Sequence, residues 1–342
     1  MTGLSRFVVA PNWLGDSVMA IPFVRALRRA HPGDRLFVAA RRGPAAIFRA
    51  AGGAEVLDIR GHLFEDSWTL RKHRFDEAWL LPNSFRSGLL AFLSGASARI
   101  GYDTDGRGRL LTHAVALPPA TRHQLRDYDR LLESRGVDPD IDPPRLPIPR
   151  EAQERADGAL ARAGLRVADP FVLLAPGAAF AWTKRWPPES FGRLGAALRR
   201  SGLACAIGIG PGEADLARQV SAAADTPLPI LGEDLGPVEL AAALSRAQVV
   251  VSNDSGPMHL AAAVGTPVVA LFGPTDPGRT APAGAPFKIL DRYVFCSPCF
   301  LKECPYAHEC MREIGPEDVL SAVEALIGKR ETESELKTDT ED

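Results

Sequence analysis

The stretch of sequence that decides the fold is Val249-Val250-Val251-Ser252-Asn253-Asp254-Ser255-Gly256-Pro257-Met258-His259-Leu260-Ala261-Ala262-Ala263. Its β-branched start predicts a buried strand, its polar middle a turn, and its alanine-rich end a helix. Pro257 suits the first helical position, where a missing N–H is tolerated. Ser255 and Gly256 then stand at the helix N-terminus, where free N–H groups and the helix dipole attract phosphate. His259 lies one turn inside and is a further candidate for the same anion, although a capped helix with a buried histidine is the alternative interpretation.

Strand and helix patterns alternate on both sides of this stretch. Strands are expected at residues 7–10, 36–40, 78–81, 171–175, 204–209, 249–252 and 268–272, and helices after the first strand and at 152–163. Such alternation predicts α/β architecture with parallel sheets. Ligands bind such sheets beyond the carboxyl ends of the strands, so the loops at those ends are the candidate sites.

Five prolines within residues 139–149 divide the chain, because this segment sustains neither a helix nor a central strand. The 342 residues are also about twice the usual length of one domain. We therefore expect an N-terminal domain at 1–150, ending in this proline-rich linker, and a C-terminal domain at 151–328. Residues 329–342 are polar and lack aromatics, and we expect them to be disordered.

Charge is distributed unevenly along the chain. The net charge of -2 argues against a nucleic-acid partner. Residues 1–150 carry 22 basic against 16 acidic side chains, and the remainder carries 18 against 26. The basic half could face an anionic partner such as a phosphorylated lipid, or its arginines could simply solvate helices. The sequence shows neither an apolar run of about 18 residues nor a secretory signal, so we expect a cytoplasmic protein.

Two further loops carry candidate ligand-binding residues. The segment after the strand at 171–175 contains Lys184, a mobile charge suited to a diphosphate, and Arg185, which could clamp or stack. The alternative is that both are solvated. The turn Gly208-Ile209-Gly210-Pro211-Gly212-Glu213 has an incomplete dinucleotide-binding spacing. Its Glu213 could accept hydrogen bonds from a ribose or sugar hydroxyl, or cap a helix.

Together these loops resemble glycosyltransferase family 9, the bacterial heptosyltransferases, over nearly the whole chain. The motifs that carry the resemblance are Pro11-Asn12-Trp13-Leu14-Gly15-Asp16, Leu81-Pro82-Asn83-Ser84-Phe85-Arg86-Ser87, Thr183-Lys184-Arg185-Trp186-Pro187, Asn253-Asp254-Ser255-Gly256-Pro257-Met258-His259 and Gly273-Pro274-Thr275-Asp276-Pro277. The second motif, with Arg99-Ile100-Gly101-Tyr102, most resembles the type II branch. Ala179 and Phe180 stand where some type I members have hydroxyl residues, which also favours type II.

The resemblance implies a GT-B fold, with two Rossmann-like domains whose parallel sheets face a central cleft. It implies an acceptor-binding N-terminal domain, a donor-binding C-terminal domain, ADP-heptose as donor, and inversion at the anomeric carbon. Carried over, the site residues are Asp16 as general base, Lys184 at the diphosphate, Glu213 at the ribose, and Asp254, Ser255, Gly256 and His259 in the donor loop. Thr183, Arg185 and Gly273 are further donor candidates; Asn12, Arg86, Arg99, Arg107 and Arg109 are candidates for the anionic acceptor.

Chemistry agrees with these roles. Inverting transfer needs one carboxylate to take the proton of the attacking hydroxyl, and the leaving diphosphate needs cations and N–H groups. Asp16 fits the first task, although an aspartate also caps helices. No metal cofactor is required, because protein groups meet the phosphate charge.

Four cysteines form a C-x2-C-x4-C-x5-C run: Cys296, Cys299, Cys304 and Cys310. In a cytoplasmic protein this density suggests a structural zinc or iron–sulfur site, although reduced thiols or a local disulfide are favoured. Catalysis is not expected to depend on them.

The activity expected from the sequence is heptosyl transfer to the heptose of a Kdo–lipid A core, at the cytoplasmic face of the inner membrane. The alternatives are another nucleotide sugar for a cell-surface glycan, or a nucleotide-sugar-binding protein that has lost transfer. The presence of Asp16 argues against the last.

Overall fold

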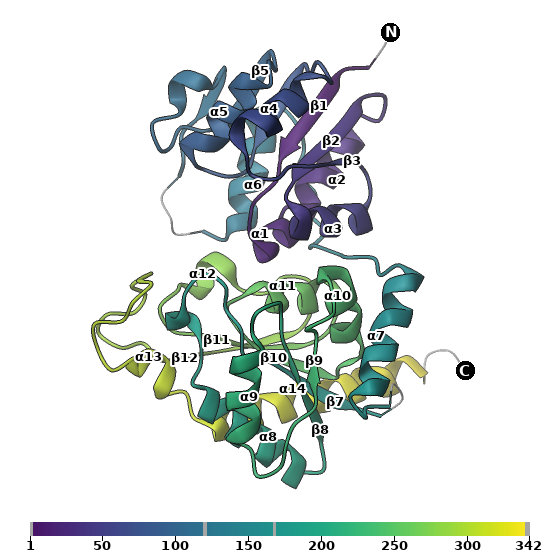
Figure 1. Ribbon diagram of the computed structural model, residues 1–342, viewed down its shortest axis with the longest axis vertical. Helices are drawn as coiled ribbons and strands as arrows, with labels where there is room; N and C mark the ends of the chain where they lie inside the picture. Colours follow the sequence, from purple (N-terminus) through teal and green to yellow (C-terminus); the bar gives the residue numbers. More distant parts are fainter. Residues whose placement is uncertain (1–2, 119–121, 167–168, 339–342) are drawn as a thin grey trace. The chain divides into compact units, whose positions relative to one another are not determined.

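A computed structural model describes residues 3–118, 122–166 and 169–338. It divides into two compact units, Met1–Pro147 and Ile148–Asp342, and the boundary lies inside the proline-rich segment 139–149. Each unit contains one six-stranded sheet in which all paired strands are parallel. The expected α/β class with two Rossmann-like parallel sheets is confirmed (Figure 1).

The sheet of the first unit has the order β3-β2-β1-β4-β5-β6. Its strands are β1 Ser5–Val9, β2 Arg35–Ala40, β3 Glu55–Asp58, β4 Glu77–Leu80, β5 Ala98–Tyr102 and β6 His113–Val115. Its helices are α1 Leu14–Met19, α2 Ile21–Ala30, α3 Arg42–Ala51, α4 Leu63–Arg71, α5 Phe85–Leu93, the 3-10 turn η1 Gly108–Leu110 and α6 Gln124–Glu133.

The sheet of the second unit has the order β12-β11-β10-β7-β8-β9. Its strands are β7 Phe171–Ala175, β8 Ala204–Gly208, β9 Ile230–Leu231, β10 Val249–Asn253, β11 Val268–Phe272 and β12 Phe287–Asp291. Its helices are α7 Arg150–Arg162, the 3-10 turn η2 Trp182–Lys184, α8 Pro188–Arg200, α9 Ala214–Ala222, α10 Pro237–Arg246, α11 Gly256–Ala263, α12 Pro277–Thr280, α13 Glu309–Arg312 and α14 Pro316–Thr338.

Both sheets have the same topology. Counted from its own first strand, each follows the doubly wound order 3-2-1-4-5-6, so the chain leaves the first strand toward one edge and returns to its other side with the fourth. This reversal places two diverging loops at the carboxyl ends of adjacent strands, the usual ligand position in such sheets. The reversal falls between β1 and β4 in the first unit and between β7 and β10 in the second.

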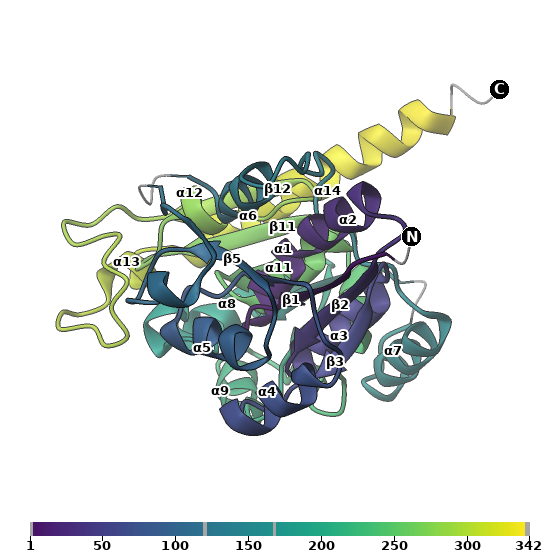
Figure 2. The same ribbon diagram turned by 90° about the horizontal axis from the view of Figure 1, so that it is seen from above.

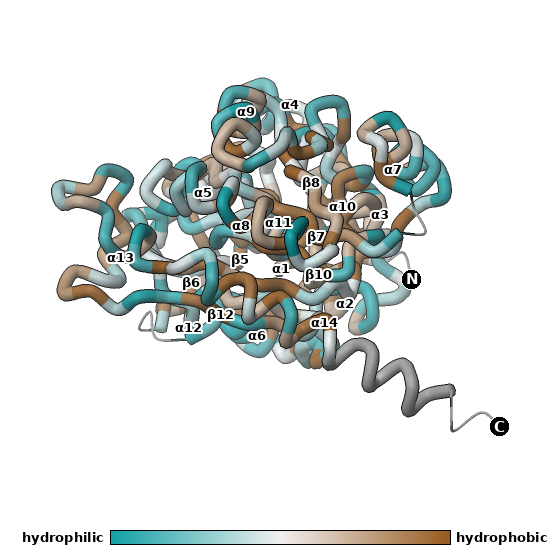
Figure 3. The backbone as a smooth tube through the Cα atoms, turned by 90° about the horizontal axis from the view of Figure 1, so that it is seen from below, coloured by the Kyte–Doolittle hydropathy of each residue, from teal (hydrophilic) through white to brown (hydrophobic). Residues whose placement is uncertain are grey.

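Strand residues alternate between two cores, as the period of two in a β-strand requires. In β1, Val8 packs into a cluster with Phe23 and Trp79, whereas Phe7 enters a separate cluster on the other face of the sheet. The second unit is built alike, with α7 and α10 packed together and α8, α9 and α14 grouped through their own contacts. Apolar colour accordingly gathers in the strands and polar colour in the loops (Figure 3).

Two expectations differ from the structure. The single helix expected after the first strand is broken between Met19 and Ile21, because Pro22 has no N–H to continue a helical ladder. The tail expected to be disordered from residue 329 is helical as far as Thr338, as part of α14 (Figure 2). Its glutamates and lysines are good helix formers, and this propensity outweighs the absence of aromatic residues. Residues 339–342 lie outside the described part of the chain. No helix of the described chain is long and apolar enough to cross a membrane.

Candidate functional site

The loops at the reversal point of the second unit meet through an ion pair. Lys184, at the end of η2, follows β7, and Asp254 follows β10. The Lys184 Nζ lies 2.6 Å from the Asp254 Oδ2, and both side chains are largely buried. The two residues come from different loops, so the pair fixes one loop against the other and holds an ammonium at the carboxyl edge of the sheet.

Asn253, which the sequence analysis quotes only as part of a motif, holds the same loops together. Its fully buried side chain accepts a hydrogen bond from the Trp186 N–H at 2.9 Å and donates one to the Pro176 carbonyl at 2.8 Å. One amide therefore satisfies backbone groups at both ends of the loop that carries Lys184. An amide has separate donor and acceptor atoms and can serve both groups at once, and the position of Asn253 at the end of a buried strand was the signal that the sequence offered.

The N-terminus of α11 is open to an anion. Ser255 is the N-cap residue and makes no side-chain capping hydrogen bond; its Oγ lies 3.3 Å from the Ser252 Oγ instead. Gly256 begins the helix and Pro257 follows it. The first N–H groups of α11 lack a capping side chain, so this terminus has the donors and the dipole to bind phosphate. His259 is buried in the helix.

Glu213 joins a third loop to this edge. Its Oε2 accepts a hydrogen bond of 2.9 Å from the Gly210 N–H. The carboxylate lies directly over Gly177, where a Cβ would overlap with both carboxylate oxygens. Glu213 therefore connects the loop after β8 with the loop after β7, and Gly177 is the residue that makes room for it.

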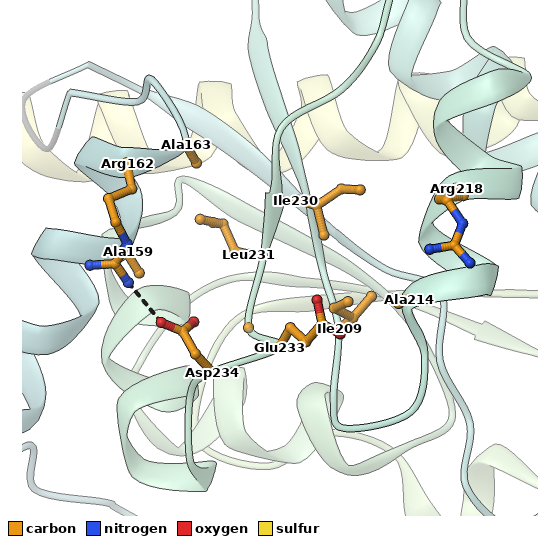
Figure 4. A pocket seen from close by; sticks show the side chains of 11 residues that line it. Ala159, Arg162, Ala163, Ile209, Ala214, Arg218, Ile230, Leu231, Glu233 and Asp234 are labelled. Atoms are coloured by element: carbon orange, nitrogen blue, oxygen red, sulfur yellow. Dashed lines mark hydrogen bonds and ion pairs between the residues drawn. The ribbon is translucent and has the colours of Figure 1, made fainter.

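A pocket of about 390 Å³ borders the same turn (Figure 4). Its apolar wall includes Ile209, Ile230 and Leu231, and its rim carries Arg162 and Asp234, whose Nη2 and Oδ2 lie 2.8 Å apart. Because Ile209 and Ala214 flank the turn that holds Glu213, the pocket and the carboxylate share one stretch of backbone.

Thr183, which was expected to contact the donor substrate, is hydrogen-bonded to other residues of the protein. Its buried hydroxyl donates to the Leu301 carbonyl at 2.7 Å, and its own carbonyl lies 2.6 Å from the His308 Nε2. A carbonyl only accepts, so Nε2 carries the proton of this imidazole. His308 also packs edge-on against Trp182, with ring centroids 5.1 Å apart. The pKa of His308 is lowered, chiefly by burial and further by Arg312, while the bond to Thr183 partly opposes the shift.

These contacts attach a cysteine-rich segment, residues 292–308, to the donor loops; we call it the cysteine loop. Besides its bonds with Thr183, it donates the N–H groups of Cys299 and Phe300 to the Pro274 carbonyl, at 3.1 and 2.8 Å. The Ser297 hydroxyl bonds to the Gly273 carbonyl. A Cβ at Gly273 would overlap with Met311, so Gly273, another donor candidate, is needed for packing against the segment that follows the loop.

All five cysteines are free thiols. Burial raises the pKa of Cys310 to about 11, and its neighbours Cys296, Cys299 and Cys304 add to the shift. Burial likewise raises the pKa of Cys205, in β8, to about 11. Among the described residues, no group of three or more His, Cys, Asp or Glu side chains is arranged to hold a metal ion.

Arg185 folds back onto its own loop. Its Nη2 donates to the Ala178 carbonyl at 3.2 Å, which helps to shape the backbone beside Lys184. Its Nε is buried without a hydrogen-bond partner in the described structure. The guanidinium therefore keeps unused donor capacity next to the ion pair.

In the first unit, Asp16 occupies the third position of α1, directly after β1. The N-cap residue of this helix is Trp13, which makes no side-chain capping bond. Asp16 is thus not the N-cap, as one interpretation of the sequence required. Asn12 lies exposed in the same loop, and Ser17 ties the loop down by donating to the Trp13 carbonyl at 2.9 Å.

Two of the arginines expected at the acceptor are hydrogen-bonded within the first unit. Arg107 is fully buried; its Nε donates to the Tyr102 carbonyl at 2.8 Å and its Nη1 to the Ser87 hydroxyl at 2.7 Å, and burial lowers its pKa to about 10. Arg99 donates to the Leu110 and Ala96 carbonyls at 2.7 and 2.5 Å. Because Arg107 is fully buried, its guanidinium is not exposed to a ligand, whereas Arg99 is only partly buried and its role at the acceptor stays a prediction.

Arg86 and Arg109 remain exposed candidates; Arg86 lies at the start of α5, after the carboxyl end of β4, and Arg109 lies in η1, before β6. Arg86 donates to the Gly61 carbonyl, and the guanidinium of Arg41 lies over the same glycine. Arg41 directly follows β2, so it belongs to the same edge. Arg41 is not among the residues expected from the sequence, where its signal is a basic residue placed immediately after a strand.

Comparison with known proteins agrees with this architecture. Residues 67–309 match the sequence profile of glycosyltransferase family 9 (heptosyltransferase). The chain is similar to lipopolysaccharide heptosyltransferase 2 of Salmonella typhimurium, with 27% identity over 94% of this chain and 98% of the relative. It is similar to the protein of the same name from Escherichia coli, with 26% identity over 95% and 99%.

Two solved structures share the fold. The ADP-heptose LPS heptosyltransferase II of E. coli superposes with a TM-score of 0.82 at 24% identity, covering 96% of this chain and all of that one. A family 9 glycosyltransferase from Veillonella parvula gives 0.83 at 24% identity, covering 95% and 97%. Fold and site together define a glycosyltransferase built from two Rossmann-like units. The chain belongs to glycosyltransferase family 9, the heptosyltransferases.

Proposed function

We propose that this enzyme transfers heptose from ADP-heptose to the heptose of a lipopolysaccharide inner core attached to lipid A. The observation that carries the proposal is the anion site of the second unit, where the Lys184–Asp254 pair stands beside the uncapped N-terminus of α11. A nucleoside diphosphate is the ligand that such a site suits. Relatives named heptosyltransferase 2 support the choice of sugar and acceptor.

In the proposed reaction Asp16 takes the proton of the acceptor hydroxyl as its oxygen attacks the anomeric carbon. The bond from that carbon to the diphosphate breaks on the opposite face, so the configuration inverts and ADP leaves. Charge develops on the diphosphate as the bond breaks. The Lys184 ammonium and the N–H groups at the start of α11 stabilise that charge better than they stabilise the bound substrate, which lowers the barrier.

The donor nucleoside is assigned to the neighbouring loops. Glu213 is proposed to accept hydrogen bonds from the ribose hydroxyls, which its position over Gly177 allows. Asp254 orients Lys184 through their ion pair. Ser255, Gly256 and His259 complete the donor loop, with His259 acting from inside α11.

The acceptor is assigned to the first unit. Asn12 and the exposed guanidinium groups of Arg86 and Arg109 are proposed to bind its phosphates and carboxylates, and Arg41 joins them. Because a lipid A anchor remains in the bilayer, the enzyme would act as a peripheral protein at the cytoplasmic face of the inner membrane.

The test is to incubate the protein with ADP-heptose and a heptosylated Kdo2–lipid A acceptor and to look for a mass increase of one heptose. An Asp16→Asn variant is the matched control, since an amide keeps the shape but cannot take the proton. We expect kcat to fall by about 10² to 10⁴ with little change in the KM for the donor. Equal activity of both proteins would remove Asp16 as the base. Binding of ADP-heptose without transfer would point to another acceptor, and preference for another nucleotide sugar would overturn the heptose assignment.

A further inference from the structure

One aromatic ring of the donor loop has two ammonium groups near it. The Lys184 Nζ lies 5.9 Å from the ring centroid of Phe180, and the Lys302 Nζ lies 5.0 Å from the same centroid. Lys302 comes from the cysteine loop, more than a hundred residues further along the chain. The ring therefore brings a lysine that no donor motif contains to within reach of the phosphate lysine.

The backbone immediately before Lys302 is hydrogen-bonded to the donor loops. The carbonyl of Leu301, the preceding residue, accepts the Thr183 hydroxyl at 2.7 Å, and the N–H of Phe300 donates to Pro274 at 2.8 Å. His308, at the end of the loop, bonds the Thr183 carbonyl. Although the cysteine loop extends away from the body of the second unit beside α13 (Figure 2), the residue before Lys302 is hydrogen-bonded to Thr183 of η2.

The charges at the site leave room for a second cation. Lys184 is already paired with Asp254, so the two together contribute no net charge to a diphosphate. The exposed ammonium of Lys302 makes no ion pair or hydrogen bond with any residue that the structure describes, apart from its approach to the Phe180 ring. Ala179 and Phe180 add no hydroxyl donors from the loop itself. Lys302 is thus a positive charge without a partner beside a site that must hold a dianion.

We propose that Lys302 binds the distal phosphate of the nucleoside diphosphate, so that the cysteine loop forms part of the donor site. The proposal rests on the proposed function, because it takes the ligand of this site to be a nucleoside diphosphate sugar. Lys184 and the α11 N-terminus hold the diphosphate from one side, and Lys302 meets the phosphate next to the sugar. Phe180 keeps the two lysine side chains apart and gives both an apolar surface along which to extend.

The test compares ADP with AMP by isothermal titration calorimetry on the full chain. Lys302→Met should weaken the binding of ADP about tenfold, which corresponds to about 1.4 kcal/mol, and should leave AMP binding within about twofold. Lys302→Arg should restore most of the ADP affinity. Lys288→Met removes an exposed lysine of β12 in the same unit and is the matched control, expected to bind both nucleotides as the unmodified protein does.

Unchanged ADP affinity in Lys302→Met would overturn the proposal. Equal weakening of ADP and AMP would also overturn it, because that pattern indicates a disturbed loop and not the loss of a distal-phosphate contact. ADP, UDP and GDP are titrated in parallel with their monophosphates. If UDP or GDP binds in place of ADP, the heptose assignment fails while Lys302 is tested on that pair. If no diphosphate binds the unmodified protein, both proposals fail.

Discussion

The carboxylate of Glu213 rests on Gly177, and this contact shows how one missing side chain can shape a site. A methyl group at position 177 would overlap with both carboxylate oxygens and push Glu213 away from its place. We expect Gly177→Ala to weaken ADP binding about tenfold, through the loss of roughly one charge-assisted hydrogen bond to the ribose.

Gly210→Ala is the matched control for this substitution. A Cβ at Gly210 would meet Glu213 at an ordinary 3.6 Å, so ADP affinity should stay within about twofold of the unmodified protein. Both affinities are measured by calorimetry, and both variants are checked for an unchanged Tm. If Gly177→Ala binds ADP normally, Glu213 does not contact the nucleotide from its observed position.

His308 makes the free energy of unfolding depend on pH in the acidic range. Its pKa is lowered in the fold, first by burial, so between the folded and unfolded values the unfolded chain binds more protons. The free energy of unfolding therefore falls as the pH drops below about 6.5, the unfolded value, and is fully present above it. We expect urea denaturation between pH 7.5 and 5 to show a shallower acid decline for His308→Gln.

His31 and His113 contribute to the acid decline with the same sign, since burial lowers their pKa values too. The comparison is therefore between the slopes of the variant and of the unmodified protein, and not between either slope and zero. The amide of the substituted glutamine would keep an N–H donor for the Thr183 carbonyl without a titrating group. Identical slopes would show that His308 does not contribute.

At the residue scale, the sequence identifies charged candidate residues, but it does not show which of them are buried or to which groups they hydrogen-bond. Lys184, Asp254 and Glu213 stand out because strands end just before their loops. Arg107 looks equally functional in the sequence but is buried and bonded to the backbone. Nothing in the spacing of the arginines separates Arg107 from the exposed Arg109, because that difference depends on how the residues 82–84 and 102–107 fold against each other.

The cysteine loop is the element whose chemistry is most easily tested. Cys296, Cys299 and Cys304 are partly exposed, whereas Cys205 and Cys310 are buried and their pKa values are raised to about 11. Since the thiolate is the form that reacts, we expect iodoacetamide at pH 8 to label the first three and to leave the other two. Mass spectrometry of the native protein should show at most three labels, and five after denaturation in guanidinium.

A native protein that carries five labels would show that the second unit opens readily around Cys310. Fewer than three labels would indicate that the exposed cysteines are occupied, for example by a metal ion or by one another. Adding a chelator, or a reductant, before the reagent separates these two cases.

Elements with an apolar run of four or five residues are predictable from the sequence. The expected ranges for β7 and β11 agree with the structure at both ends, and β10 differs by one residue. The missed strands are β3, β5, β6, β9 and β12, and each is short or only partly buried. Four of them, β3, β6, β9 and β12, are the edge strands, where one side lacks a neighbour and the pattern of burial is weaker; β5 lies one strand in from an edge.

At the scale of the whole molecule, uneven charge should appear as uneven sensitivity to salt. The first 150 residues carry six more basic than acidic side chains, and the proposed acceptor residues there are exposed. Exposed charges are screened strongly at about 0.15 M salt, whereas the Lys184–Asp254 pair is largely buried.

We therefore expect the KM for the acceptor to rise several-fold between 50 and 500 mM NaCl, with a smaller rise in the KM for ADP-heptose. Steady-state kinetics at fixed concentrations of the second substrate measure both values. Potassium glutamate at matched ionic strength is the control for specific effects of chloride. A steeper salt dependence of the KM for ADP-heptose than of the KM for the acceptor would contradict the assignment of the exposed charges to the acceptor.

The overall class of the fold was predictable because both halves repeat the same strand–loop–helix pattern and a proline-rich segment separates them. Strand order was not, because the sequence does not show which strands become neighbours. The ion pair between the loops after β7 and β10 follows from that order, so it could be rationalised only once the sheet was known.

Each unit is formed by one continuous range of residues, and this affects when each can fold during synthesis. Residues 1–147 contain every strand of the first sheet, and none is supplied from further along. In that sheet β1 pairs with β2 and β4, and β4 is synthesised about seventy residues after β1. Once residue 147 has left the ribosome, the first unit has all its partners and can fold while the second is still being translated. At about 5–20 residues per second, synthesis of residues 148–338, which carry the elements of the second unit, gives the first unit a head start of roughly 10 to 40 s. The second sheet repeats the same wait between β7 and β10, and its strands are synthesised only after every strand of the first sheet has been made.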